Sequence, residues 1–120
     1  MNQKIQIRAE FSISQENLRE FVVYIKQLSK IIKEKEPNTT EYLFYLDEKN
    51  TICHVHESYE NSDAAIAHNN NFASKTILQK IFQISTMNKI DVYGAPSEEL
   101  KELLTAFNAR FFTVIAGYRF

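Results

Sequence analysis

The chain begins with a strict alternation of apolar and polar residues, which is typical of a strand with one buried face. Between Ile5 and Ile13 every second residue is apolar, and the residues between them are polar or charged. A different pattern follows, because from Leu18 to Ile32 apolar residues recur at steps of three and four. This spacing predicts an amphipathic helix, with Ser14 as its N-cap, that packs on the strand.

Two extended segments come after a break at Pro37, which disfavours helix at the residue before it. The segments 40–47 and 51–59 are rich in β-branched and aromatic residues, and the polar stretch 48–50 between them has turn chemistry. Together these features predict a β-hairpin.

The second half of the chain is expected to alternate helices and strands, because capping residues and apolar stripes recur in it. The predicted elements are a short helix capped at 61–63 and running to His68, a helix at 76–84, a strand at 88–94, a helix after the Ser97 cap, and a strand at 111–120.

The predicted order is β-α-β-β-α-β with one more helix and strand at the C-terminus. This is the ferredoxin-like, split βαβ plan of the α+β class, in which helices cover one face of an antiparallel sheet. Alternate positions of the second strand, such as Leu43 and Tyr45, are also apolar, so both sheet faces require burial. A second copy of the chain is the simplest cover, and we predict a homodimer through the sheet faces.

Composition narrows the class of protein. At 120 residues, a single domain spanning 1–120 is expected, and 44% hydrophobic with 24% charged residues exclude disorder. A net charge of -1 gives no reason to expect nucleic acid or an anionic membrane as partner. Because Cys53 is the one cysteine and no window approaches the ~20 apolar residues of a membrane span, a cytoplasmic location is expected.

The third predicted strand carries most of the candidate chemistry. Strand periodicity sends His54 and His56 to one face and Glu57 to the other. With His68, the two histidines would supply three nitrogen ligands, but no carboxylate shares their strand face, so no metal site is expected.

A short motif spans this strand and the helix after it. Glu57 stands on the strand, and Tyr59 follows two residues later. Ala65 is a small residue on the helix, and His68 and Phe72 come after it. In this order the residues resemble the motif of the antibiotic biosynthesis monooxygenase superfamily.

The resemblance covers about residues 3–94, the basic ferredoxin-like unit, and leaves 95–120 as a C-terminal helix-strand extension. It implies a dimeric α+β barrel with a pocket in each subunit between the sheet and its helices. Superfamily activities include cofactor-independent oxygenation of quinol-like aromatic substrates and oxidative haem breakdown. The haem-degrading members rely on a Trp, and this chain has none, so haem breakdown is disfavoured and no cofactor is expected.

The resemblance therefore implies a cofactor-independent monooxygenase that acts on a quinol-like or phenolic small molecule with dioxygen. His68 would transfer the proton, because an imidazole exchanges protons near neutral pH, and Glu57 would orient it or act as the base. The expected lining of the substrate pocket is aromatic: Tyr42, Tyr59, Phe72 and Phe82.

Ordinary structural roles account for the same residues. His68 would then be a helix-end histidine bonded to backbone or to Glu57, and the aromatics would be core. The alternative function is a homodimer of the same fold that binds a small ligand without turnover, or whose pocket is filled by its own side chains; haem binding is a third reading. The cavity beside His68 discriminates, because ligand sites usually exceed about 300 Å³.

Overall fold

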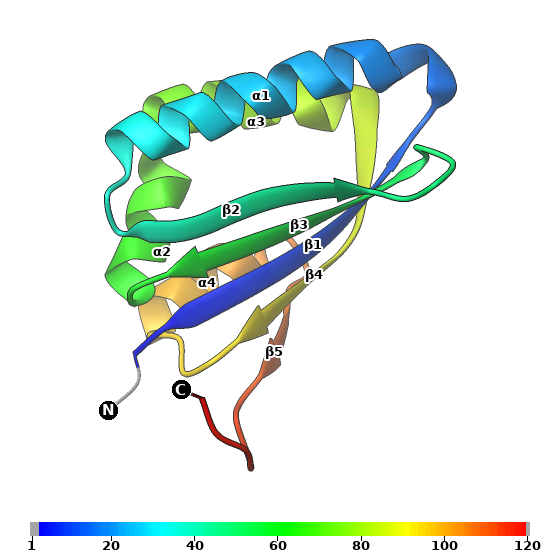
Figure 1. Ribbon diagram of the computed structural model, residues 1–120. Helices are drawn as coiled ribbons and strands as arrows, with labels where there is room; N and C mark the ends of the chain where they lie inside the picture. The colour runs from blue at the N-terminus through cyan, green and yellow to red at the C-terminus, as the bar shows by residue number, and fades with distance from the viewer. Residues whose placement is uncertain (1–2, 120) are drawn as a thin grey trace.

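The helices cover one face of a five-stranded sheet in the computed structural model, which describes residues 3–119 (Figure 1). The order across the sheet is β2-β3-β1-β4-β5. Neighbours run antiparallel, except for the parallel pair of β4 and β5. In chain order the strands are β1 (Ile5–Ile13), β2 (Thr39–Leu46), β3 (Ile52–Tyr59), β4 (Ser85–Tyr93) and β5 (Arg110–Phe112).

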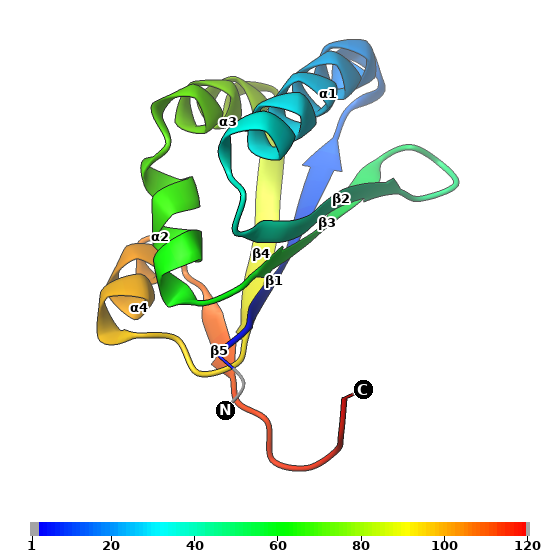
Figure 2. The same cartoon turned by 60° about the vertical axis from the view of Figure 1, so that its left-hand side comes forward.

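The helices form two pairs above this sheet. The long helices α1 and α3 pack side by side, and α2 packs against α4 at one end (Figure 2). A 3-10 turn at Gln15–Asn17 leads into the first helix. The helices are α1 (Leu18–Lys35), α2 (Ser62–Asn70), α3 (Phe72–Ile84) and α4 (Glu98–Thr105).

The core forms where the two predicted patterns meet. Along β1 every second residue is buried, as the alternation predicts. On α1 the side chains of Phe21, Ile25, Leu28 and Ile32 are buried against them. The predicted hairpin is confirmed: β2 pairs with β3, and the Asp47 side chain accepts the Thr51 and Ile52 N–H groups at 2.9 and 3.0 Å.

The starts of α1, α3 and β4 lie several residues from the predicted ones. Ser14 makes no side-chain capping bond, because the 3-10 turn comes between it and α1. Helix α3 begins at Phe72 rather than at 76, because Asn71 caps it by accepting the N–H groups of Ala73 and Ser74. Strand β4 begins at Ser85, directly at the end of α3.

The last strand is much shorter than predicted. It was expected over 111–120, but β5 ends at Phe112 because β4, its neighbour in the sheet, ends at the paired residue Tyr93. Beyond this point the described tail, 113–119, runs without strand pairing and turns back below the sheet (Figures 1 and 2). The predicted α+β, ferredoxin-like plan with an added C-terminal helix and strand is nevertheless confirmed.

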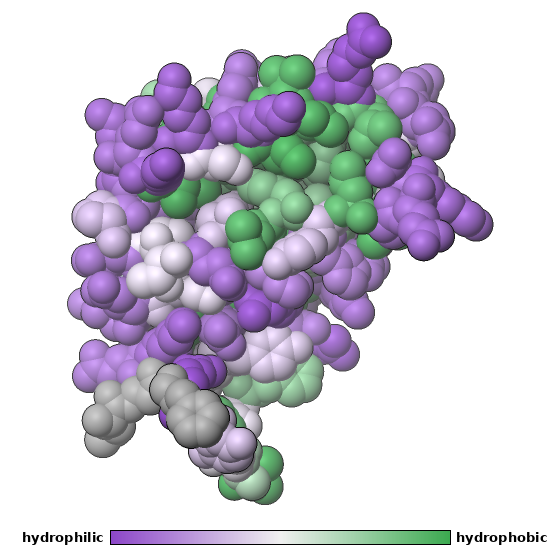
Figure 3. All heavy atoms as spheres, viewed as in Figure 1, coloured by the Kyte–Doolittle hydropathy of each residue, from purple (hydrophilic) through white to green (hydrophobic). Residues whose placement is uncertain are grey.

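The helix-free face of the sheet carries apolar side chains. Leu43 and Tyr45 on β2, and Tyr93 and Phe112 on β4 and β5, are exposed there. Hydrophobic side chains also gather between α1 and the edge strand β2, and near the start of the tail, where Val114 and Ile115 are exposed (Figure 3). None of the helices within the described range has the length and apolar run that a bilayer span requires.

Candidate functional site

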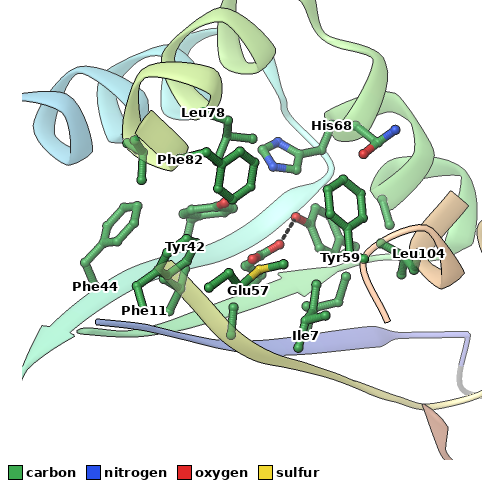
Figure 4. A pocket seen from close by; sticks show the side chains of 18 of the residues that line it. Ile7, Phe11, Tyr42, Phe44, Glu57, Tyr59, His68, Leu78, Phe82 and Leu104 are labelled. Carbon is green, nitrogen blue, oxygen red and sulfur yellow. Dashed lines mark hydrogen bonds between the residues drawn. The ribbon is translucent and has the colours of Figure 1, made fainter. Parts of the chain in front are cut away.

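A small cavity lies between the sheet and the helices (Figure 4). Its volume is about 80 Å³, and β1, β2, β3 and β4 meet α1, α2, α3 and α4 around it. Most of its lining is aliphatic or aromatic. The polar side chains in the lining are Tyr42, Glu57, Tyr59, His68 and Asn69.

Glu57 points from β3 into this cavity and is buried. The hydroxyl of Tyr59 donates a hydrogen bond of 2.5 Å to Glu57 Oε1. Burial raises the pKa of Glu57, and the nearby charge of His68 and the Tyr59 hydrogen bond reverse only part of that shift. Glu57 therefore holds its proton at a higher pH than an ordinary carboxyl group.

Two tyrosine hydroxyls stand beside this carboxyl. Burial, followed by the negative charge of Glu57, raises the pKa of Tyr42 and of Tyr59 well above the ordinary tyrosine value. Both phenols thus keep their protons at neutral pH and act as hydrogen-bond donors.

His68 lies in the last turn of α2, and its ring faces the cavity. Its Nδ1 is 2.8 and 3.1 Å from the two carboxylate oxygens of Glu36. The ring packs against Tyr42 and Tyr59, with centroid distances of 5.2 and 5.8 Å. Within residues 3–119, Nε2 has no hydrogen-bond partner, so the free nitrogen is the one available to a ligand.

Glu36 is the C-cap residue of α1 and is buried. Burial alone would raise the pKa of Glu36, but hydrogen bonds from His68, Ser74 and Thr39 and the charge of His68 bring it below the ordinary value. Burial likewise opposes the charge on His68, yet the hydrogen bond to Glu36 and the charges of Glu57 and Glu36 raise the pKa of His68. The two side chains therefore favour an imidazolium–carboxylate pair.

The predicted partner of His68 was wrong. If His68 had a structural role, the sequence predicted a bond to backbone or to Glu57. The partner is instead Glu36, which the sequence did not single out. The sequence offers one signal: Pro37 disfavours helix at Glu36, and the chain leaves α1 there with ψ of 79°. This turn places the Glu36 carboxylate within hydrogen-bond distance of His68 on α2.

Three of the four predicted aromatic lining residues are in place: Tyr42, Tyr59 and Phe82 line the cavity. Phe72 does not, because it is the first residue of α3 and its side chain is 83% exposed. Sequence analysis also missed the wall that the C-terminal extension supplies, formed by Leu100 and Leu104 on α4 and Phe107 after it. Their helical stripe was visible in the sequence, but not where it docks.

The three histidines do not converge. His54 and His56 project from β3 on the face opposite Glu57, where His54 Nε2 lies 2.9 Å from Glu10 Oε1. Among the described residues, no group of three or more His, Cys, Asp or Glu side chains is placed to hold a metal ion.

Comparisons with known proteins identify the fold. No protein-family model and no curated protein matches the chain. Solved structures do match. MupZ from Pseudomonas fluorescens is 24% identical, with a TM-score of 0.78 over 100% of this chain and 91% of MupZ.

Two further matches carry an oxygenase name. A "putative antibiotic biosynthesis monooxygenase" from Caulobacter crescentus is 20% identical, with a TM-score of 0.69 over 80% of this chain and 92% of its own. A mutant of SnoaB, a cofactor-independent oxygenase from Streptomyces nogalater, is 9% identical, with a TM-score of 0.68 over 79% and 95% of the two chains. The fold is that of the antibiotic biosynthesis monooxygenases.

The resemblance seen in the motif is thus confirmed at the level of the antibiotic biosynthesis monooxygenase fold. The MupZ alignment spans the whole chain, so the extension with α4 falls inside it, whereas the SnoaB alignment spans 79% of the chain.

Proposed function

We propose that this protein is a cofactor-independent monooxygenase that acts on a quinol-like or phenolic small molecule with dioxygen. The observation that carries the proposal is the polar end of the cavity. Two groups with shifted pKa values face one otherwise apolar space: Glu57, whose pKa is raised by burial, and His68, whose pKa is raised by its carboxylate neighbours. Groups whose pKa values are shifted in a shared cavity are typical of acid–base sites.

In the proposed reaction, the carboxylate of Glu57 removes a proton from an aromatic carbon acid or phenol. The imidazolium of His68 and the tyrosine hydroxyls stabilise the negative charge that develops on the substrate oxygen. The substrate anion transfers one electron to dioxygen, and the two radicals combine into a carbon-bound peroxide. The peroxide regains that proton. The second C–H proton on the same carbon is then removed, the O–O bond breaks, and the departing hydroxide takes up this proton and leaves as water while the carbonyl forms.

The atoms and electrons of these reaction steps balance without a cofactor. The substrate loses two hydrogen atoms and four electrons, one oxygen atom enters the new carbonyl, and the other leaves as water. The apolar lining supports the scheme, because a cavity that excludes water protects the anion and the peroxide from side reactions.

The size of the cavity sets a condition on this proposal. At about 80 Å³ it is smaller than the roughly 300 Å³ of ordinary ligand sites, so an aromatic substrate requires the wall to move. Phe82 and Phe107 are the part of the lining best placed to do so. Their rings pack at a centroid distance of 6.3 Å, and both side chains are partly exposed.

The same volume favours a second candidate function. A protein of this fold whose cavity is largely filled by its own side chains needs no substrate, and it would serve as a structural homodimer or bind a small ligand without turnover. Oxygen uptake by the purified protein with a panel of hydroquinones and anthrone-like phenols decides between the two.

We expect saturable uptake that falls at least about tenfold in His68→Ala, equivalent to about 1.4 kcal/mol of transition-state stabilisation. His54→Ala is the matched control, because His54 lies on the opposite sheet face and should retain full activity. Uptake by the wild type no faster than by boiled protein, across the panel, would replace the oxygenase with the second candidate.

The proposal includes a homodimer through the helix-free sheet face. Its support is the set of exposed apolar side chains at the two edges of that face, Leu43 and Tyr45 on β2 and Phe112 on β5. Sedimentation equilibrium should give twice the chain mass of 14.0 kDa for the wild type, and a lower mass for Tyr45→Lys. A wild-type protein that sediments as a monomer at micromolar concentration would refute it.

A further inference from the structure

His68 and Glu36 connect two separate hollows of the molecule. His68 lines the inner cavity, whereas Glu36 lines a hollow of about 450 Å³ on the outer surface, near the ends of α1 and α2. Asn71 and Asp63 line the outer hollow as well. Because Nδ1 of His68 bonds to the Glu36 carboxylate at 2.8 Å, this pair forms the wall between the two spaces.

The Glu36 carboxylate is held on all sides. Besides His68, it accepts hydrogen bonds from Ser74 Oγ at 2.8 Å, Thr39 Oγ1 at 3.0 Å and Asn71 Nδ2 at 3.2 Å. These donors come from α3, from the start of β2 and from the junction of α2 and α3, and Glu36 itself is only 8% exposed. A carboxylate with four donors from separate elements has one orientation, so it imposes that orientation on the imidazole.

We propose that Glu36 is the positioning residue of the site: it keeps a proton on Nδ1 of His68, directs Nε2 into the cavity and holds the ring in its charged form. The neutral ring has two tautomers, and an acceptor at Nδ1 selects the one that leaves Nε2 facing the ligand. Without that acceptor the buried ring would lose charge and orientation together.

The charges around His68 support this role. Glu36 contacts the ring on the outer side, and Glu57 of β3 acts on it from the cavity side, which together raise the pKa of His68 against the effect of burial. The remaining titratable neighbours, Tyr42 of β2 and Tyr59 of β3, keep their protons and carry no charge. Of the two carboxyl groups, Glu36 alone forms a hydrogen bond with the ring.

The first test measures His68 directly and needs no substrate. In ¹⁵N-detected NMR titrations, Glu36→Gln should lower the pKa of His68 by about 1 to 3 units, because an amide of the same size cannot replace the charge. In Glu36→Ala, which has no acceptor for Nδ1–H, the ¹⁵N shifts should also lose the pattern of a proton fixed on Nδ1. Asp63→Asn is the matched control, because it removes a carboxylate that lines the same hollow but does not bond to His68. In this variant His68 should titrate as it does in the wild type.

The second test uses the outer hollow. In Glu36→Ala the truncated side chain leaves space next to a solvent-open hollow, so added formate should occupy the carboxylate position and restore the His68 titration. A purely structural role for Glu36 would show no such recovery. If Glu36→Ala does not fold, formate has nothing to restore, and the result with Glu36→Gln decides alone.

A third test, of activity, rests on the proposed function. Its outcomes distinguish a failure of the oxygenase proposal from a failure of the positioning role of Glu36. Oxygen uptake should fall at least about tenfold in Glu36→Ala and recover with formate. Wild-type protein without uptake, but with the His68 shift in Glu36→Gln, would remove the oxygenase and keep the positioning role. A His68 titration in Glu36→Gln that matches the wild type would overturn the positioning role, whatever the activity.

Discussion

Replacing Ala65 by valine tests whether the cavity is real and whether function depends on it. Ala65 lies on α2, is buried and lines the cavity. The preceding residue, Ala64, is also buried on α2, but it lines the outer hollow and not the cavity. The substitutions Ala65→Val and Ala64→Val therefore add the same atoms to the same helix in two different surroundings.

The structure sets the size of the effect. An empty volume of about 80 Å³ costs the folded state about 2 kcal/mol, at roughly 24 cal/mol per Å³ of cavity. Valine adds two carbon atoms, which contribute about 1.6 kcal/mol if they enter that space, at about 0.8 kcal/mol each. The lower helix propensity of valine offsets about 0.5 kcal/mol. Ala65→Val should thus be about 1 kcal/mol more stable than the wild type.

Ala64→Val receives the helix penalty without the gain, so it should be less stable than the wild type. Urea denaturation at constant slope measures both: with a slope of about 2 kcal/mol per M, the midpoint of Ala65→Val should rise by about 0.5 M. The filled cavity should also abolish oxygen uptake. Ala65→Val being no more stable than Ala64→Val would mean that no usable space lies beside Ala65, and the reasoning about the site would fail with it.

Two further predictions concern stability. Because burial raises the pKa of Glu57, the native state binds more protons than the unfolded chain from about pH 4 upward, so its stability falls as pH rises through that window. Glu57→Gln should remove this loss of stability. The difference in unfolding free energy between Glu57→Gln and the wild type, measured in urea, should therefore grow in favour of the variant from about pH 4 to neutral pH. A difference that does not change with pH would contradict the raised pKa of Glu57. Gly94→Ala should cost more than about 2 kcal/mol, because φ is +127° and the new Cβ would lie 2.7 Å from the Lys4 carbonyl oxygen. Gly117→Ala has a similar φ of +123° but meets nothing within 4 Å, so an equal loss in both variants would rule out the clash.

Local periodicity was sufficient to predict most of the fold. The alternation from Ile5 to Ile13 and the stripe on α1 translate directly into buried faces, because each pattern matches the geometry of its own element. The end of β5 was not predictable in this way. Its length depends on where β4 stops beside it, and that is a property of the pairing rather than of the segment 111–120.

The candidate site was predictable where a residue sits on a regular element. Glu57 and Tyr59 follow from strand alternation, and they face the cavity together. Glu36 escaped prediction because a helix C-cap has no periodicity, and the direction of its side chain is set by the loop after it. Phe72 was misplaced for a related reason, since the Asn71 cap starts α3 earlier and turns the aromatic ring outward.

Two destabilising features, a buried carboxyl group and an empty volume, lie side by side in this cavity. Their coincidence argues for a ligand site rather than a packing defect. Glu57 is buried, and within the described range it forms no ion pair with a lysine or arginine, so the Tyr59 hydrogen bond and the charge of His68 offset only part of the cost of burial. The empty volume adds a second cost beside it. By contrast, Asp91 on the outer face is fully compensated by Arg110, with two bonds of 2.8 and 3.0 Å. Destabilising features that coincide in one place, in a protein that pairs Asp91 with an arginine elsewhere, are typical of a ligand-binding site.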